Sequence, residues 1–160
     1  MAQQPISVLI VDDHPVVRQG LRVLLEVQDG GLAESLRRYA VLAGRAHGIP
    51  VTFTAAELPA LSPRTEAALY RVAQEALHNA LRHSGAGTVC VRLSRAPRRV
   101  TLEIRDDGHG FTPEAPSGGV GLASMRQRAA NVGGTLSIRS GASGTHIRMA
   151  VPVNAEAGGQ

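Results

Sequence analysis

The stretch Leu69-Tyr-Arg-Val-Ala-Gln-Glu-Ala-Leu-His-Asn-Ala-Leu-Arg-His-Ser84 decides the fold that we expect for this chain. At about 100° per residue it winds into a helix with one apolar side, made of Leu69, Val72, Ala73, Ala76 and Ala80. Glu75 and Asn79 are one turn apart at the edge of that side, and Arg82 continues their row. A carboxylate and an amide at the edge of a buried face predict groups that line a pocket. The alternative is an ordinary amphipathic helix with polar residues at its border.

The composition is that of a globular protein. The chain has 160 residues, 43% of them hydrophobic, which is enough for one domain with a core. Only 2% of the residues are aromatic and none is Trp, which disfavours a protein that stacks the bases of single-stranded nucleic acid. The 17 basic residues are all Arg, and the net charge is +4. The arginines are spread along the chain and form no long basic run. We therefore expect no nucleic-acid partner.

Cys90 is the only cysteine of the chain. An intramolecular disulfide and a zinc site built on cysteine ligands are therefore excluded. The sequence shows no signal peptide and no apolar run of membrane-spanning length. We expect a cytoplasmic chain that makes no membrane contact itself.

The N-terminal residues predict a β–α unit of their own. Ser7–Val11 is an apolar, largely β-branched run typical of a buried strand, and Asp12 and Asp13 follow at its carboxyl end. The unit resembles the start of a response-regulator receiver domain, in which the acidic pair helps to hold Mg²⁺. The resemblance ends near Glu26, so we expect a truncated receiver-like fragment over residues 1–30, without receiver activity. Alternatively, Ser7–Val11 adds a strand to the domain that follows.

Residues 31–154 predict one further domain, followed by a loose polar tail over 155–160. Helices are expected over Leu32–His47, from Pro63 to Ser84 with Ser62 as the cap, and over Leu122–Val132. Strands are expected over Val51–Ala55, Thr88–Leu93, Val100–Asp106, Thr135–Arg139 and Thr145–Val153. Glycine-rich connections are expected over Asp107–Gly121 and Ser140–Gly144.

Side-chain alternation along the strand 100–106 turns an acid toward the core. The apolar residues of this strand share one face, Asp106 continues that face, and Asp107 points to the other side. A carboxylate on the core side is costly unless something satisfies it, and the amino group of a ligand would do so. The alternative is a turn aspartate at a glycine-rich corner. Thr145 likewise begins the core-facing set of the last strand.

A second group of glycines, Gly118-Gly119-Val120-Gly121, stands directly before the helix that we expect to begin at Leu122. Glycines let the backbone approach a ligand, and a helix N-terminus offers N–H groups to phosphate. The alternative is a flexible hairpin.

Together these elements resemble the N, G1, G2 and final GT motifs of the histidine-kinase ATPase domain. The motifs are Glu75 with Asn79, Asp106-Asp-Gly-His-Gly110, Gly119-Val-Gly121, and Gly144-Thr145. The resemblance implies the Bergerat fold shared with the gyrase B subunit, the large heat-shock chaperone and MutL. This fold is an α/β (α+β) two-layer sandwich, with helices over one face of a mixed sheet. The stretches Leu69–His83 and Gly121–Ala130 are similar to sensor kinases that pair with helix-turn-helix response regulators.

The resemblance also implies roles for the matching residues. Asn79 would ligate Mg²⁺, Glu75 would act as general base or position the attacking group, and Asp106 would accept the amino group of adenine. Gly110, Gly119 and Gly121 would shape a lid over the phosphates, and Thr145 would support the adenine end through water. The remaining expected contacts of ATP are Arg82, His83, Gly108, Val120 and Leu122.

Four further residues of these stretches are Arg82, His78, His83 and His109. Arg82 stands where the family often has Lys, and its planar guanidinium is not equivalent to an ammonium group. His83 falls nearer the apolar side of the helical wheel, which favours a packed histidine. His78 and His109 are expected to be exposed and not catalytic.

The resemblance implies that a complete sensor kinase of this branch has a phosphoacceptor histidine on a dimerisation helix, normally followed by an acidic residue. The six histidines here precede Pro15, Gly48, Asn79, Ser84, Gly110 and Ile147, so none of them matches. We therefore expect a catalytic domain that binds Mg-ATP, is inactive or slow alone, and serves a dimerisation domain with its histidine in trans and a cognate response regulator. The alternatives are a non-catalytic nucleotide-binding or regulatory module and an anti-sigma-type serine kinase of the same fold.

Overall fold

The computed structural model describes residues 30–112 and 119–153. The predicted β–α unit near the N-terminus, the middle of the glycine-rich loop and the C-terminal tail lie outside these residues. The expectations for those segments therefore stay predictions.

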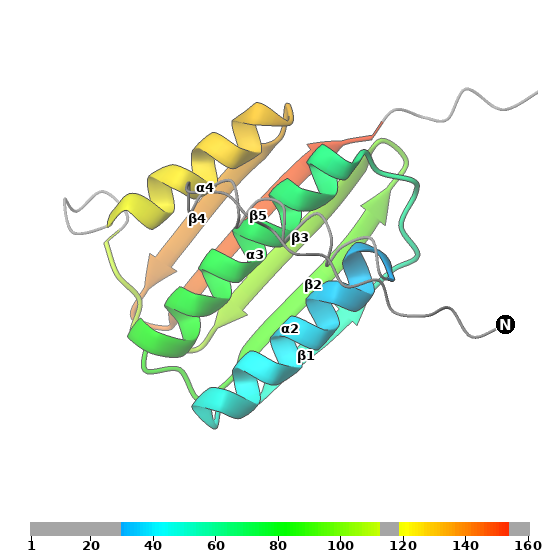
Figure 1. The fold of residues 1–160 in the computed structure, drawn as a ribbon. Coiled ribbons are helices and arrows are strands. Elements are labelled where there is room, and N and C mark those ends of the chain that lie inside the picture. The colour runs from blue at the N-terminus through cyan, green and yellow to red at the C-terminus, as the bar shows by residue number, and fades with distance from the viewer. Residues whose placement is uncertain (1–29, 113–118, 154–160) are drawn as a thin grey trace, which may run out of the picture.

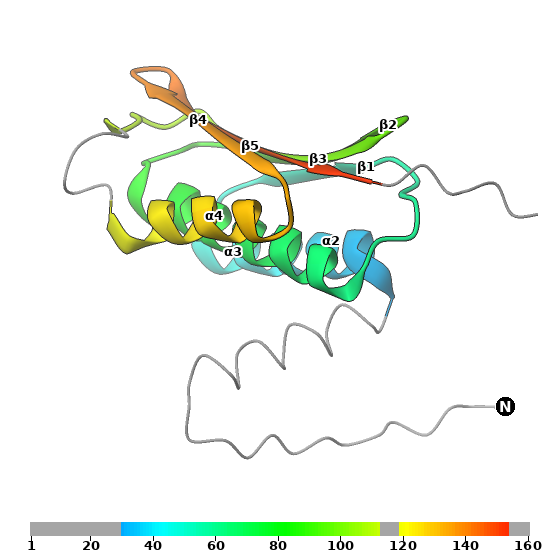
Figure 2. The same ribbon diagram turned by 90° about the horizontal axis from the view of Figure 1, so that it is seen from above.

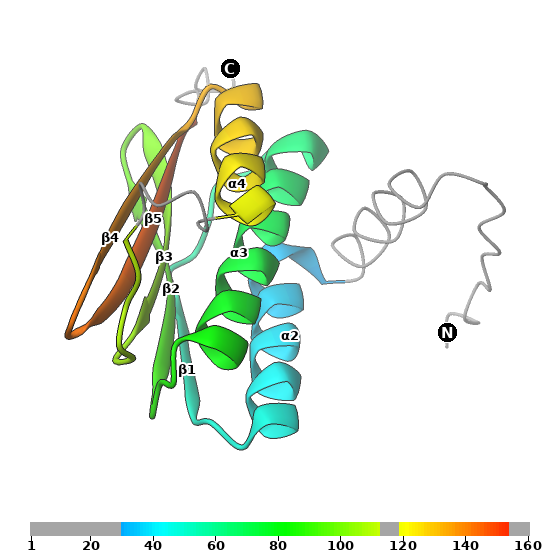
Figure 3. The ribbon, with the colours of Figure 1, turned by 90° about the vertical axis from the view of Figure 1, so that its left-hand side faces the viewer.

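The described residues form two layers, a sheet and a set of helices over one of its faces (Figures 1 and 2). In chain order the elements are α2 (Gly31–His47), β1 (Val51–Ala55), α3 (Pro63–His83), β2 (Val89–Ala96), β3 (Arg99–Asp106), α4 (Gly119–Asn131), β4 (Thr135–Gly141) and β5 (Gly144–Pro152). Figure 3 shows the sheet edge-on, with α2, α3 and α4 all on the same side of it. The predicted two-layer architecture with helices on one face is confirmed.

The sheet is mixed, as predicted, with the strand order β1-β2-β3-β5-β4. β1 runs parallel to β2, and the other neighbouring strands are antiparallel. The register places Asp106 at the end of β3 directly opposite Thr145 at the start of β5. Asp106 and Thr145, which were both singled out from the sequence, thus lie side by side at the same end of two neighbouring strands.

Helix α3 lies between α2 and α4 and carries the centre of the core (Figure 1). It begins as predicted, because the Ser62 hydroxyl accepts the Thr65 N–H at 3.1 Å and Pro63 occupies the first turn. All five residues of the predicted apolar side are buried, and none is more than 3% exposed.

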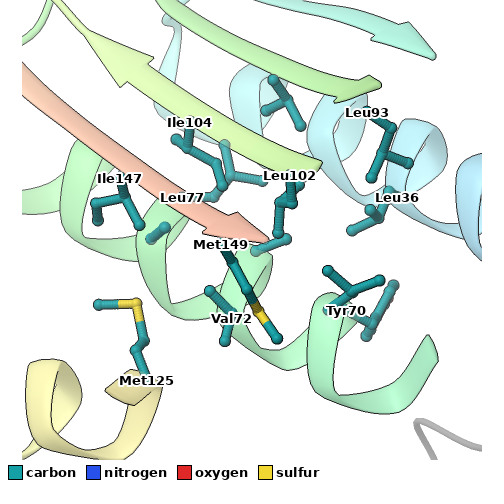
Figure 4. Packing of buried hydrophobic residues seen from close by; sticks show 14 of the residues in the cluster. Leu36, Tyr70, Val72, Leu77, Leu93, Leu102, Ile104, Met125, Ile147 and Met149 are labelled. Atoms are coloured by element: carbon teal, nitrogen blue, oxygen red, sulfur yellow. The ribbon is translucent and has the colours of Figure 1, made fainter. Parts of the chain in front are cut away.

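The core beneath α3 is aliphatic, as the scarcity of aromatic residues requires. Figure 4 shows Val72 and Leu77 of α3 packed toward Leu102 of β3 and Met149 of β5. Leu102 and Met149 are completely buried, so they belong to the interior between helix and sheet.

Several predicted boundaries are wrong. β2 continues to Ala96, because its ladder with β3 runs on to the pair Ala96 and Arg99. β4 and β5 extend to Gly141 and Gly144, so that the expected five-residue connection is a two-residue turn. Helix α4 begins at Gly119, three residues earlier than predicted.

Candidate functional site

A cavity of about 220 Å³ opens between α3, the ends of β3 and β5, and the loop that follows β3. Its apolar walls come from Ala76, Ala80, Ile104, Leu122 and Ile147. Its polar groups come from Asn79, His83, Ser84, Asp106, His109, Thr112 and Thr145, and Gly110 and Phe111 complete the lining. A mainly apolar pocket with a few convergent polar groups is the usual form of a small-molecule site.

Asp106 supplies a carboxylate to this cavity, as strand alternation predicts. Its Oδ1 accepts the N–H of Gly108 at 2.9 Å and the N–H of Thr145 at 3.3 Å. Among the described residues, no donor forms a hydrogen bond with Oδ2. The carboxylate is therefore held in a fixed orientation by one oxygen and retains the other for a ligand.

Asp107 points the other way and has a structural role. It accepts the N–H groups of Gly87 and Thr88 at 2.8 and 2.9 Å and the Thr88 hydroxyl at 3.0 Å. The bonds from Thr88, followed by the bond from Gly87, hold the pKa of the Asp107 carboxyl below its usual value. Asp107 thus ties the end of β3 to the segment before β2, outside the cavity.

The turn after Asp106 packs tightly on the end of α3. Gly108 is buried, and a Cβ at this position would overlap the carbonyl and side chain of Ser84. The N–H of His109 donates to that same Ser84 carbonyl at 2.9 Å. Gly108 is therefore needed for a close approach of two backbones; it is not among the residues that line the cavity, and its predicted contact with ATP stays a prediction.

The stripe Ala76, Ala80 and His83 on α3 faces the cavity. The two alanines are buried, but His83 is exposed and contacts His78 with the ring centroids 5.9 Å apart. The prediction that His83 packs in the core is wrong, because the last turn of this stripe faces an open cavity and not the sheet. His78 and His109 are exposed, as expected.

Asn79 and Glu75 are both half-buried, but they face different spaces. Asn79 lines the cavity that contains Asp106. Glu75 lies one turn earlier and lines a separate polar cavity between α2, α3 and α4. Its neighbours in that cavity are Tyr39, Arg71, Gln74, His78, Ser124 and Arg128.

The polar cavity has a defined electrostatic character. Burial first, and the charge of Glu75 second, raise the pKa of the Tyr39 hydroxyl. Arg71 and Arg128 give the same cavity two positive groups. Sequence reasoning identified Glu75 but missed the cations and the tyrosine around it, because Tyr39 and Arg128 come from other helices.

Gly121 lies where α4 packs against the Glu75 side chain. A Cβ at this position would overlap the Glu75 carboxylate. Gly119, Val120 and Gly121 belong to the first turn of α4, which corrects their predicted place in the loop, whereas their predicted contacts with the nucleotide stay predictions. Leu122 begins a buried side of α4 that continues with Met125 and Ala129.

Two further predicted residues have contrasting positions. Thr145 is buried, lines the cavity and bonds to Asp106 through its N–H, so its predicted orientation is confirmed. Arg82 is exposed in the last turn of α3 and is not among the residues that line either cavity. The structure therefore does not bring the Arg82 guanidinium to the site.

The polar groups of the cavity suit a metal ion that is bound partly by the protein and partly by the phosphates of a nucleotide. The described residues contain no cluster of three or more His, Cys, Asp or Glu side chains that could hold a metal ion. Asn79 presents one amide to the cavity. Mg²⁺ commonly takes one or two protein oxygens beside substrate phosphates and water, so Asn79 fits that chemistry.

Residues 64–155 match the family described as histidine kinase-, DNA gyrase B-, and HSP90-like ATPases. This segment is more than half of the chain and contains every group of the cavity. The chain belongs to this ATPase family. Because the family is one of ATPases, ATP is the nucleotide that corresponds to this site.

Individual relatives of this ATPase domain are sensor kinases. It is 35% identical to the sensor histidine kinase YhcY of Bacillus subtilis over 132 residues, which cover 81% of this chain and 34% of that kinase. It is 39% identical to the signal transduction histidine-protein kinase/phosphatase UhpB of Salmonella typhimurium, over 58% of this chain and 18% of that protein. The chain thus spans about a third or less of the length of these relatives.

The fold is also that of solved kinase structures. The histidine kinase domain of the Erythrobacter litoralis EL346 blue-light activated kinase matches with a TM-score of 0.71 and 23% identity, over 84% of this chain and 71% of that one. This similarity supports the fold of the ATPase domain. In the part of the chain that the structure describes, no helix is both long and apolar enough to cross a membrane.

Proposed function

We propose that this domain binds Mg-ATP and transfers the γ-phosphoryl group to a histidine on a separate dimerisation domain. The observation that carries the proposal is the arrangement of Asp106. One carboxylate oxygen is fixed by two backbone N–H groups, and the other is available at an apolar cavity whose helical wall holds Asn79.

The Asp106 end of the cavity suits adenine. The exocyclic amino group of adenine is a hydrogen-bond donor that Oδ2 can accept, whereas guanine presents a carbonyl oxygen in the equivalent place. Ile104, Ile147 and Leu122 provide apolar walls for a planar ring. The cavity volume of about 220 Å³ lies below the roughly 300–1,000 Å³ of a site that encloses a whole ligand. It therefore fits the base, with the phosphates extending out of it.

The Asn79 side of the cavity suits the phosphates. The amide oxygen of Asn79 would hold Mg²⁺, which bridges phosphate oxygens and neutralises the charge that develops during phosphoryl transfer. Gly110 has a positive φ of 70° and lines the same cavity, so backbone and not a side chain borders the ligand there.

Glu75 lines the cavity between α2, α3 and α4, and in this proposal the acceptor histidine approaches it there. In the transfer, a ring nitrogen of the acceptor histidine forms a bond to the γ-phosphorus, and the bond between that phosphorus and the bridging oxygen of ADP breaks. The Glu75 carboxylate would orient the imidazole ring and take the proton from the ring nitrogen that does not attack phosphorus. Arg71 and Arg128 in the same cavity give the approaching phosphoryl group a positive environment.

The acceptor domain and the regulator are partners in this proposal. A cognate response regulator would use the phosphohistidine, in the cytoplasm where ATP is available. The names of the relatives, which are sensor histidine kinases, support this assignment.

The proposal is tested by incubating the chain with γ-labelled ATP, Mg²⁺ and a purified dimerisation domain that carries the acceptor histidine. We expect label on that histidine, and its loss with Glu75→Gln. The matched control is Glu66→Gln, which alters an acid in the first turn of the same helix and should retain transfer. Label on neither chain, with ATP binding intact, would instead indicate a nucleotide-binding regulatory module.

A further inference from the structure

The inner face of the β4–β5 hairpin carries two hydroxyl groups in direct contact. Ser140 and Thr145 are opposite each other in the ladder, and their oxygens are 2.7 Å apart. Thr145 lines the cavity that holds Asp106. Ser140 stands behind Thr145, in a position that sequence reasoning assigned to a connecting loop.

Ser140 also holds the segment that follows the Asp106 turn. Its hydroxyl oxygen accepts the N–H of Phe111 at 2.8 Å. A Cβ at the preceding residue, Gly110, would overlap the carbonyl of Gly141. Backbone therefore packs on backbone beside the hydrogen bond, and Phe111 and Thr112 are placed at the cavity.

The other end of this arrangement is the carboxylate itself. The N–H of Thr145 donates to Asp106 Oδ1 at 3.3 Å. A Cβ at Gly144, where φ is 125°, would overlap the Asp106 carbonyl. The hairpin is thus pressed against the end of β3 on one side and against Gly110 on the other.

These contacts form one continuous path. It runs by hydrogen bonds from the Phe111 N–H to the Ser140 hydroxyl and on to the Thr145 hydroxyl, and then through the covalent bonds of Thr145 to its N–H, which donates to Asp106. The bonds at the two hydroxyls polarise each other, whereas Thr145 links them to Asp106 through its position. Asp106, Thr145 and Phe111 all line the same cavity.

We propose that Ser140 is a positioning residue that couples occupancy of the base end to the placement of Phe111. The proposal rests on adenine binding at Asp106. A base that bonds to Asp106 and orders Thr145 also orders the hydroxyl pair, and with it the wall at Phe111. By linkage, fixing that wall strengthens base binding by the same factor.

The test uses Ser140→Ala, with Ser137→Ala as the matched control. Ser137 is on the same strand but alternates to the exposed outer face. The first measurement is amide exchange at Phe111 by NMR in the nucleotide-free chain. Exchange should accelerate in Ser140→Ala and stay unchanged in Ser137→Ala, whether or not the chain binds ATP.

The second measurement adds an ATP analogue with Mg²⁺. In the parent chain the analogue should slow exchange at Phe111. In Ser140→Ala that slowing should disappear and affinity should fall about five- to tenfold, the size of one net hydrogen bond. Ser140→Thr, which restores the hydroxyl, should recover both effects.

Two results would overturn the coupling. One is nucleotide-dependent slowing at Phe111 that persists in Ser140→Ala, and the other is an affinity equal to that of the parent chain. If Ser140→Ala does not fold, Ser140→Cys keeps the size and weakens the acceptor, so it replaces that variant. Failure of the parent chain to bind the analogue at all would instead refute the proposed nucleotide site, while the nucleotide-free exchange still tests the bond from Phe111 to Ser140.

Discussion

Replacing Asp106 by Asn separates the two roles of its carboxylate, which are to accept backbone N–H groups and to accept the amino group of adenine. The amide oxygen of Asn can still accept the N–H groups of Gly108 and Thr145, which now bond to Oδ1. The amide NH₂ then occupies the place of Oδ2 and meets the amino group of adenine, donor against donor. The fold should therefore persist while base recognition is lost.

The magnitude follows from the bond that is removed. A hydrogen bond to a charged group contributes about 1.5–3 kcal/mol, and the unpaired donors place Asp106→Asn in the upper part of that range. We expect a loss of about 2–3 kcal/mol in binding, or roughly 30- to 150-fold in Kd. The assay is calorimetric titration with an ATP analogue and Mg²⁺, with thermal unfolding as the check on folding.

The neighbouring aspartate provides the control for this variant. Asp107 bonds only to Gly87 and Thr88 among the described residues and points away from the cavity. Asp107→Asn removes the same charge one position along the chain and should retain affinity within about twofold. An Asp106→Asn variant that folds and binds as tightly as the parent chain would refute the assignment of the base end.

Three further predictions follow from the site and the core. Because the pKa of Asp107 is lowered in the folded chain, the stability it adds is present above its unfolded pKa of about 3.9 and is lost as pH falls through the lower folded value. The difference in melting temperature between the parent chain and Asp107→Asn should accordingly shrink below pH 4, and a gap that widens in acid would contradict this. Gly121→Ala should displace the Glu75 carboxylate and lower phosphoryl transfer more than ATP affinity; equal losses in the transfer and titration assays would show that the close packing serves the nucleotide itself. Leu102→Ala removes a completely buried side chain and should cost about 2–5 kcal/mol of unfolding free energy in urea, whereas a cost below 1 kcal/mol would mean that this contact is not central.

The sequence predicted side-chain orientation correctly in elements where a periodic apolar pattern marks a buried face. The 3.6-residue period of α3 located its apolar side, and strand alternation oriented Asp106, Asp107 and Thr145 correctly. These patterns work because a helix or strand fixes the direction of each side chain relative to its neighbours. The family resemblance supplied the roles of the residues, which alternation alone does not.

Other features depended on contacts between distant segments. Ser140 could not be identified as a positioning residue, because its partner Phe111 is 29 residues away in the chain. The start of α4 was predicted too late because no local pattern shows that Gly121 lies against the Glu75 carboxylate of α3. His83 was misplaced because a helical wheel does not show whether a stripe faces a core or a cavity.

The most direct test of the central claim is calorimetric titration of the purified chain with Mg-ATP, Mg-ADP and Mg-GTP. If Asp106 reads the base and Asn79 helps to hold the metal, ATP and ADP should bind at one site. GTP should bind at least tenfold more weakly, and removing Mg²⁺ should weaken ATP binding in the parent chain but not in Asn79→Ala. Equal binding of GTP and ATP, or an Mg²⁺ response that survives in Asn79→Ala, would contradict the account.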